Sequence, residues 1–134
     1  MKAQVKWLGD ELFLGSSASG HTLVLDANAD GVAPSPLENT LISLGSCSSV
    51  DVVSILQKGR QAISGCTVEI NATRVDSVPK LFSTIHLHFV ITGKNIKATS
   101  VERAVTLSAD KYCSVALMLN GNVNITHDFS IIEQ

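Results

Sequence analysis

Residues 35–59 read SPLENTLISLGSCSSVDVVSILQKG and decide the fold, because they predict one long apolar helix. Ser35 is a favourable helix cap, Pro36 suits the first helical position, and Glu38 completes a capping box. Gly59 is a residue at which helices commonly end. The helix is therefore expected to begin at Pro36 and to end just before Gly59.

Apolar side chains cover most of the circumference of this predicted helix. One side is apolar except for Ser48, and a second side is apolar as well. A helix that is apolar on most sides is usually central and buried, and here a partner chain is expected to cover part of it. The first side consists of Leu37, Leu41, Leu44, Ser48, Val52 and Ile55, and the second of Ile42, Val50, Val53 and Leu56.

The length and composition predict one small domain that associates with a copy of itself. The chain has 134 residues and a mass of 14.2 kDa, which suits a single domain over residues 1–134. Hydrophobic residues make up 45% and charged residues 16%, with a mean hydropathy of +0.26. A small monomer has too little interior for this much apolar surface, so homo-oligomerisation is expected to cover the rest.

The charge pattern and the short apolar runs exclude several classes of function. The net charge is −2, and the densest basic groups, Lys58–Arg60 and Lys94–Lys97, are too sparse for binding to nucleic acid. No stretch approaches the ~18 uninterrupted apolar residues of a membrane span, and no secretory signal begins the sequence. Three cysteines, an odd number, fit a reducing compartment. We expect a cytoplasmic protein without nucleic-acid or membrane partners.

Three short strands are expected before the long helix. Residues 3–8 alternate apolar and polar side chains, and Gly9–Asp10 is a hairpin turn signal. Consecutive short strands of this kind most simply form an antiparallel meander. The predicted strands are 3–8, 11–14 and 21–26, and the predicted loops are 15–20 and 27–34.

Two strands, a second helix and a last strand are expected after Gly59. Residues 66–72 and 81–92 alternate in strand fashion, and Thr99–Glu102 forms a second capping box. The helix that it opens is expected to run to about Leu119, with a break near Ser108–Asp110. The last predicted strand is 122–132, which gives an α+β domain with the order βββ–α–ββ–α–β.

Cys47 lies inside the long helix between the small residues Gly45, Ser46, Ser48 and Ser49, which leave room for a ligand or another helix. It lies about three turns from the helix N-terminus, which is too far for the helix dipole to stabilise a thiolate. Two interpretations stay open at this point. Cys47 is either a small core residue with a raised pKa or a reactive thiol.

The role of Cys113 depends on whether the second helix is continuous. If the helix breaks at Ala109, Asp110 becomes an N-cap and Cys113 the third residue of a new segment, where free N–H groups and Lys111 favour a thiolate. Without the break, Cys113 is a core residue. Cys66, on the apolar face of a strand, is expected to be structural.

If the two helices pack side by side, Cys47 and Cys113 would make a peroxidatic and resolving pair. One thiolate would attack a peroxide, become a sulfenic acid and be captured by the other thiol as a disulfide. The spacing in the sequence neither requires nor forbids this pairing.

The remaining chemically versatile side chains have simpler explanations. His86 and His88 share a strand face but have no third ligand at a metal-like spacing, so neither a metal site nor a cofactor is expected. His127 is expected to be a hydrogen-bonded core residue. Asp51, in a very apolar helix, needs a solvated cleft or a partner across an interface.

Two motifs together resemble the osmotically inducible protein C (OsmC) family. Ser35–Glu38 opens a helix that carries Gly45–Cys47, and Lys111–Val115 lies on the later helix. The resemblance covers essentially the whole chain, including its length and element order, and is closest to the short OsmC-like branch. It implies an OsmC-like fold with two central helices in an intertwined homodimer, and sites at the subunit interface.

The resemblance also implies a thiol-dependent hydroperoxide reductase, a peroxidase of the oxidative stress response. Cys47 would attack a small or organic hydroperoxide, and Cys113 would resolve the product. A dithiol, often a lipoyl group, would be the reductant. The alternative function is a non-catalytic dimeric protein that binds a small apolar ligand at the subunit interface.

Two positions depart from the pattern of the peroxidase members. Those members have Glu after the helix-opening Pro, where this chain has Leu37, and Glu38 lies about 100° further round the helix. They also use an Arg from the N-terminal strands to stabilise the thiolate, yet Arg60 is the first Arg here. Lys2 and Lys6 are the cations of that region, and Lys does not reproduce the two parallel hydrogen bonds of Arg.

Overall fold

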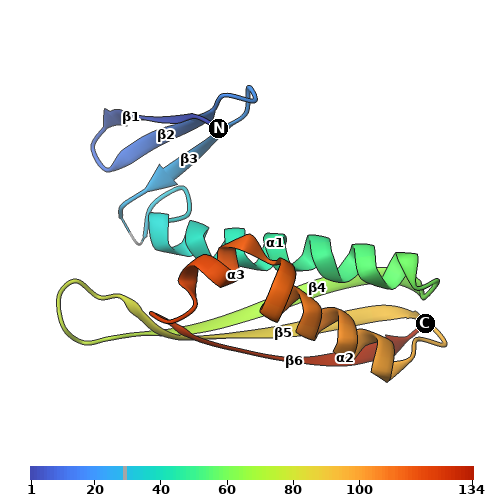
Figure 1. The fold of residues 1–134 in the computed structure, drawn as a ribbon. Helices are drawn as coiled ribbons and strands as arrows, with labels where there is room; N and C mark the ends of the chain where they lie inside the picture. Colours follow the sequence, from blue (N-terminus) through green and yellow to red (C-terminus); the bar gives the residue numbers. More distant parts are fainter. Residues whose placement is uncertain (29) are drawn as a thin grey trace. The chain divides into compact units, whose positions relative to one another are not determined.

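The computed structural model describes residues 1–28 and 30–134, which form two compact units, Met1–Ile42 and Ser43–Gln134. The predicted order βββ–α–ββ–α–β is confirmed, except that the second helix is two pieces joined by a π-helical turn (Figure 1). Ala29, within the expected loop 27–34, lies outside the described residues. The elements are β1 (Ala3–Gly9), β2 (Leu12–Ser17), β3 (Thr22–Asp26), α1 (Pro36–Lys58), β4 (Ala62–Arg74), β5 (Phe82–Lys94), α2 (Ala98–Leu107), η1 (Ser108–Tyr112), α3 (Ser114–Leu119) and β6 (Asn124–Glu133).

The first unit contains an antiparallel sheet in the order β1–β2–β3. Gly9 and Asp10, with φ angles of 99° and 48°, turn the chain from β1 into β2 at the predicted place. The loop predicted at residues 15–20 is wrong in its first half, because β2 continues to Ser17. Gly15 and Ser16 pair with β1 on one side and β3 on the other, so sheet pairing outweighs their loop-like composition.

The capping box at the start of α1 is confirmed. The N–H of Glu38 donates to Ser35 Oγ at 3.2 Å, and the N–H of Ser35 donates to Glu38 Oε1 at 2.9 Å. These bonds satisfy N–H groups that a helix start leaves free. The helix ends at Lys58, as predicted. By length and composition alone α1 also qualifies as a helix able to cross a membrane, a test that core helices of soluble proteins pass too.

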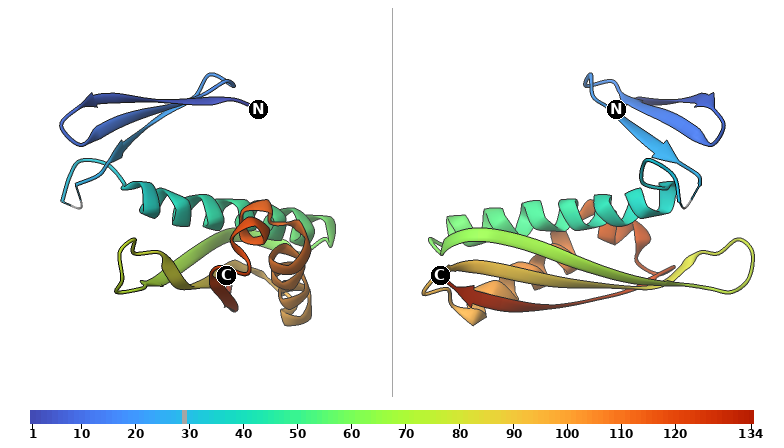
Figure 2. Two further views of the ribbon diagram at one scale, coloured as in Figure 1. Left: turned by 60° about the vertical axis from the view of Figure 1, so that its left-hand side comes forward. Right: turned by 180° about the vertical axis from the view of Figure 1, so that it is seen from behind.

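The second unit contains the sheet β4–β5–β6, in which β5 pairs antiparallel with β4 and parallel with β6. Alternate residues of β5 are buried against the helices, while the others lie on the opposite face. Figure 2 shows that opposite face, seen from behind, with α2 and α3 on the far side of the strands. The β5 contribution to the core is Ile85, Leu87, Phe89 and Ile91, and the helices contribute Leu44, Val52, Leu56, Val101, Ala104 and Val105.

The predicted start of the second helix is wrong, whereas its predicted break is confirmed. Residues 99–102 do not form a capping box, because Lys97 is the N-cap residue of α2. Its N–H donates instead to the Oε1 atom of Gln61 at 2.9 Å, a partner from a distant part of the sequence. The helix then passes through the π-helical turn η1, after which Cys113 has an extended backbone, with φ −72° and ψ 104°.

Candidate functional site

Cys47 and Cys113 lie in the same unit, on α1 and at the start of α3. All three cysteines are free thiols; Cys47 is half-buried, and Cys113 is fully buried with an exposed fraction of 0%. Cys113 is itself the N-cap residue of α3, so the expected assignment of Asp110 as N-cap is wrong. The π-helical turn carries the helix past Asp110, and the N–H of Cys113 bonds to the carbonyl oxygen of Ser108 at 2.8 Å.

The sulfur of Cys113 accepts two hydrogen bonds. The hydroxyl of Ser48 donates to Sγ at 3.3 Å, and the backbone N–H of Ala116 donates to it at 3.4 Å. Ser48 comes directly after Cys47 on α1 and is 2% exposed. Both donors would stabilise negative charge on the sulfur, which is what a thiolate intermediate of Cys113 requires.

A second buried hydroxyl links this region to a carboxylate. Ser108 is 1% exposed, and its Oγ lies 3.3 Å from the backbone oxygen of Ser48 and 3.1 Å from Oδ2 of Asp51. The sequence predicts that Asp51 needs a cleft or a partner, and Ser108 is a partner within the same chain. The roles of both serines are not apparent from the sequence. The one signal for Ser48 is its place as the single polar member of an apolar helix face.

The environment of Cys113 balances opposing effects on its acidity. Burial is the largest and raises the pKa of the Cys113 thiol above its ordinary value. The bonds from Ser48 and Ala116 lower this pKa, and the neighbouring Cys47 thiol raises it. Cys47 is therefore close enough to affect Cys113, and the net effect of these contributions is a raised pKa of the Cys113 thiol.

Cys66 has a separate environment on β4. Burial raises the pKa of its thiol, and a hydrogen bond with Ser49 lowers it. Cys66 is half-buried. These contacts are those of a packed side chain within the sheet-and-helix layer.

His86 and His88 lie together on the face of the sheet opposite the helices. His86 Nε2 and His88 Nδ1 lie 3.0 and 2.6 Å from Oδ1 of Asp128 on β6. The hydrogen bond with His88 and, to a smaller extent, that with His86 lower the pKa of the Asp128 carboxyl. The parallel register of β5 and β6 brings Asp128 here, which spacing in the sequence does not indicate. Within residues 1–28 and 30–134, no group of three or more His, Cys, Asp or Glu side chains has an arrangement that could hold a metal ion.

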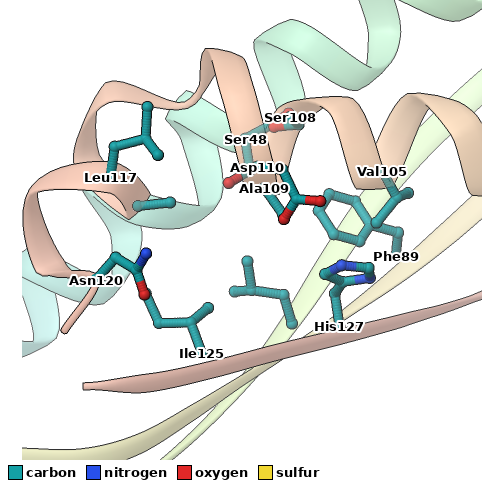
Figure 3. A pocket seen from close by; sticks show the side chains of 12 residues that line it. Ser48, Phe89, Val105, Ser108, Ala109, Asp110, Leu117, Asn120, Ile125 and His127 are labelled. Atoms are coloured by element: carbon teal, nitrogen blue, oxygen red, sulfur yellow. Dashed lines mark hydrogen bonds between the residues drawn. The ribbon is translucent and has the colours of Figure 1, made fainter.

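His127 lines a cavity of about 190 Å³ between the sheet and the helical segments (Figure 3). Its ring and the carboxylate of Asp110 are turned into this cavity, with Asn120 at the opposite end. No hydrogen bond joins the His127 side chain to another described residue, so the prediction of a hydrogen-bonded core histidine is wrong. Ser48 and Ser108 line the cavity too, whereas neither cysteine is among the described residues that do.

A family model, a relative of known sequence and solved structures each match most of this chain. The model of the family described as OsmC-like protein matches residues 27–128. Protein YhfA of Escherichia coli K12 is 52% identical over 132 residues, which are 98% of each chain. A hypothetical protein of Aquifex aeolicus has a crystal structure with a TM-score of 0.89 at 28% identity, over 99% of this chain and 96% of that one. An organic hydroperoxide resistance protein of Legionella pneumophila shares the fold, with a TM-score of 0.72 at 18% identity, over 96% and 95% of the two chains.

Proposed function

Because this chain belongs to the OsmC-like protein family, we propose that Cys47 and Cys113 are a redox pair that reduces a small or organic hydroperoxide. One observation carries the proposal: Ser48, the residue directly after the half-buried Cys47, donates a hydrogen bond to the sulfur of the buried Cys113 at 3.3 Å, although 65 residues separate Ser48 from Cys113 in the sequence. Relatives that share the fold include proteins named for organic hydroperoxide resistance. Their names support the proposed substrate class.

The proposed reaction has three steps. The thiolate of Cys47 attacks one oxygen of the hydroperoxide; the O–O bond breaks, an alcohol leaves with a proton, and Cys47 becomes a sulfenic acid. The sulfur of Cys113, losing its proton, then attacks the Cys47 sulfur, so that an S–S bond forms, the S–O bond breaks and water leaves. A dithiol reductant restores both thiols by exchange and is itself oxidised to a disulfide. No cofactor takes part.

The burial of the two cysteines supports this division of roles. Cys47 is half-buried and can meet a small solute, whereas Cys113 has no exposed surface. The donors Ser48 and Ala116 point at Cys113, where they would stabilise the thiolate that attacks the sulfenic acid. Reducing conditions, as in the cytoplasm, would keep the pair ready for a further cycle.

We also propose that the protein is a homodimer. In the first unit Val5, Trp7 and Leu23 are exposed by 65%, 65% and 47%, and Val50 of the second unit is exposed by 68%. A second copy that covers these side chains would remove a large apolar surface from water.

Sedimentation equilibrium is expected to give twice the chain mass of 14.2 kDa. Val50→Glu should give monomers, because it places a charge in the proposed contact. Val78→Glu is the matched control, since Val78 is also exposed, by 89%, and lies in the connection between β4 and β5. Monomeric wild-type protein at micromolar concentration would overturn this assembly.

The redox proposal is tested by mass spectrometry without reducing agent, after addition of one equivalent of cumene hydroperoxide. We expect the intact chain to lose two hydrogen atoms within seconds, and its peptides to show a disulfide between Cys47 and Cys113. Thiols unchanged after prolonged exposure would overturn the proposal and favour a binding protein without catalysis. A disulfide that includes Cys66 would overturn the assignment of the pair.

A further inference from the structure

The cavity in the second unit has the size and walls of a site for one small ring. Its apolar walls come from Leu87 and Phe89 on β5, Ile125 on β6 and Val105 on α2. Its volume is about 190 Å³. For comparison, an enclosed and wholly apolar engineered cavity of about 150 Å³ binds benzene. The present cavity is of similar size but opens to solvent beside Asp110, Leu117 and Asn120, which are exposed. A single-ring molecule with a short polar substituent therefore fits this space.

Polar groups in the same cavity restrict the chemistry of an occupant. The side chains of Asp110, Asn120 and His127 are turned into the space (Figure 3). Asp110 and Asn120 are exposed and His127 is half-buried, so these groups lie at the solvent-accessible part of the cavity. A hydroxyl group can donate to Asp110 or His127 and accept from Asn120. No Lys or Arg is among the described lining residues, so the Asp110 carboxylate makes the site unfavourable for anions.

The wall of the cavity is directly connected to Cys113. Ser48 and Ser108 line the cavity, and the Ser48 hydroxyl donates to the Cys113 sulfur at 3.3 Å. Cys113 also connects the two helical segments η1 and α3, each of which contributes residues to the cavity: Asp110 lies in η1 and Ala116 in α3. An occupant that replaces water in the cavity would make the surroundings of the buried Ser48–Cys113 hydrogen bond less polar, which acts in the same direction as the burial that raises the pKa of Cys113.

We propose that this cavity binds a neutral single-ring alcohol, and that Cys113 senses its occupancy through Ser48. The binding is independent of peroxide chemistry and lies within one chain. Only the consequence for catalysis rests on the proposed function: an occupant that keeps Cys113 protonated would slow resolution of the Cys47 sulfenic acid. By reciprocity, ionisation of Cys113 would weaken the binding of the alcohol by the same factor.

Binding is tested by fluorine NMR on the reduced protein, with 4-fluorobenzyl alcohol as the probe and 4-fluorobenzoate as the anionic comparison. We expect saturable binding of the alcohol and none of the acid. Asn120→Leu should weaken binding about tenfold by removing one polar contact, and Ala109→Leu should abolish it by filling the space. The matched controls Asn122→Leu and Ala98→Leu change side chains that do not line the cavity and should bind as wild type does.

Sensing is tested by the ¹³Cβ chemical shift of labelled Cys113, followed against pH. A saturating amount of the alcohol should move the titration midpoint upward by about half a pH unit. In Ser48→Ala, at an alcohol concentration that saturates that variant, the displacement should be absent. Non-saturable binding, equal binding of the acid, or unchanged affinity in Ala109→Leu would overturn the site. An unmoved midpoint with bound alcohol would overturn the sensing. Binding in a protein that leaves peroxide unreacted would overturn the proposed function alone.

Discussion

Replacement of Cys47 by serine is expected to abolish the consumption of cumene hydroperoxide by the reduced protein. A serine hydroxyl stays protonated at neutral pH and is a far weaker nucleophile than a thiolate, and no base in the described part of the chain is seen to activate it. The measurement is the loss of peroxide in the presence of dihydrolipoamide, a dithiol. The rate should fall to that of the same mixture without protein.

Cys113→Ser separates the two proposed roles. This variant should react once with peroxide and then stop as the Cys47 sulfenic acid, which dimedone traps as a thioether on the peptide that contains residue 47. Cys66→Ser is the control and should retain full activity, because its environment on β4 is separate from the pair. If Cys47→Ser still consumes peroxide while Cys113→Ser does not, the roles are the reverse of those proposed.

Ser48→Ala is expected to raise the titration midpoint of Cys113 by about one pH unit. The Ser48 hydroxyl lowers the pKa of this thiol, so its removal leaves burial less opposed and moves the pKa further upward. A hydrogen bond to a charged group contributes about 1.5–3 kcal/mol, and about 1.4 kcal/mol corresponds to one pH unit. The Cβ chemical shift of labelled Cys113, recorded against pH, measures the change.

The same variant should slow disulfide formation at neutral pH about tenfold, because a smaller fraction of Cys113 is thiolate. Ser46→Ala is the matched control on α1, since among the described residues the hydroxyl of Ser46 bonds only to the carbonyl oxygen of Ser43, at 3.1 Å. It should leave both the midpoint and the rate unchanged. A Ser48→Ala protein with the wild-type midpoint would show that this hydroxyl holds the position of the helix and not the charge state of the thiol.

Local signals in the sequence predict the elements of this fold well, because the groups that decide them are close together in the chain. Ser35 and Glu38 satisfy each other's N–H groups three residues apart, so the start of α1 can be predicted from four letters. The same pattern at residues 99–102 fails, because Gln61 satisfies the N–H of Lys97 from across the fold. A capping residue supplied by tertiary structure leaves no trace in the local sequence.

The candidate site depends on contacts that the sequence does not encode locally. Cys47 and Cys113 are singled out by their residue type and by the family resemblance, whereas the approach of Ser48 to Cys113 depends on how α1 lies against the start of α3. The cavity beside them depends in the same way on the parallel pairing of β5 with β6, which brings Ile125 and His127 beneath the helical segments. Neither arrangement follows from periodicity.

The absence of an Arg before Arg60 bears on the rate of the first step. A guanidinium beside a thiolate stabilises it by charge and by two directed hydrogen bonds, and Lys2 and Lys6 do not offer that geometry. The donors near the pair, Ser48 and Ala116, serve Cys113. The proposed attack of Cys47 on peroxide is therefore expected to be slower than it would be beside an Arg.

Because of the π-helical turn at Ser108–Tyr112, the position of Cys113 depends on the number of residues in this turn as well as on their identity. Such a turn places one more residue in a helical turn than an α-helix holds, and each residue of an α-helix rotates the chain by about 100°. Deleting a single residue between Ser108 and Cys113 would let the helix run on regularly and would point the sulfur away from Ser48. A related chain could thus keep every cysteine and serine of the site and still lose the proposed thiol chemistry through one deletion in this turn.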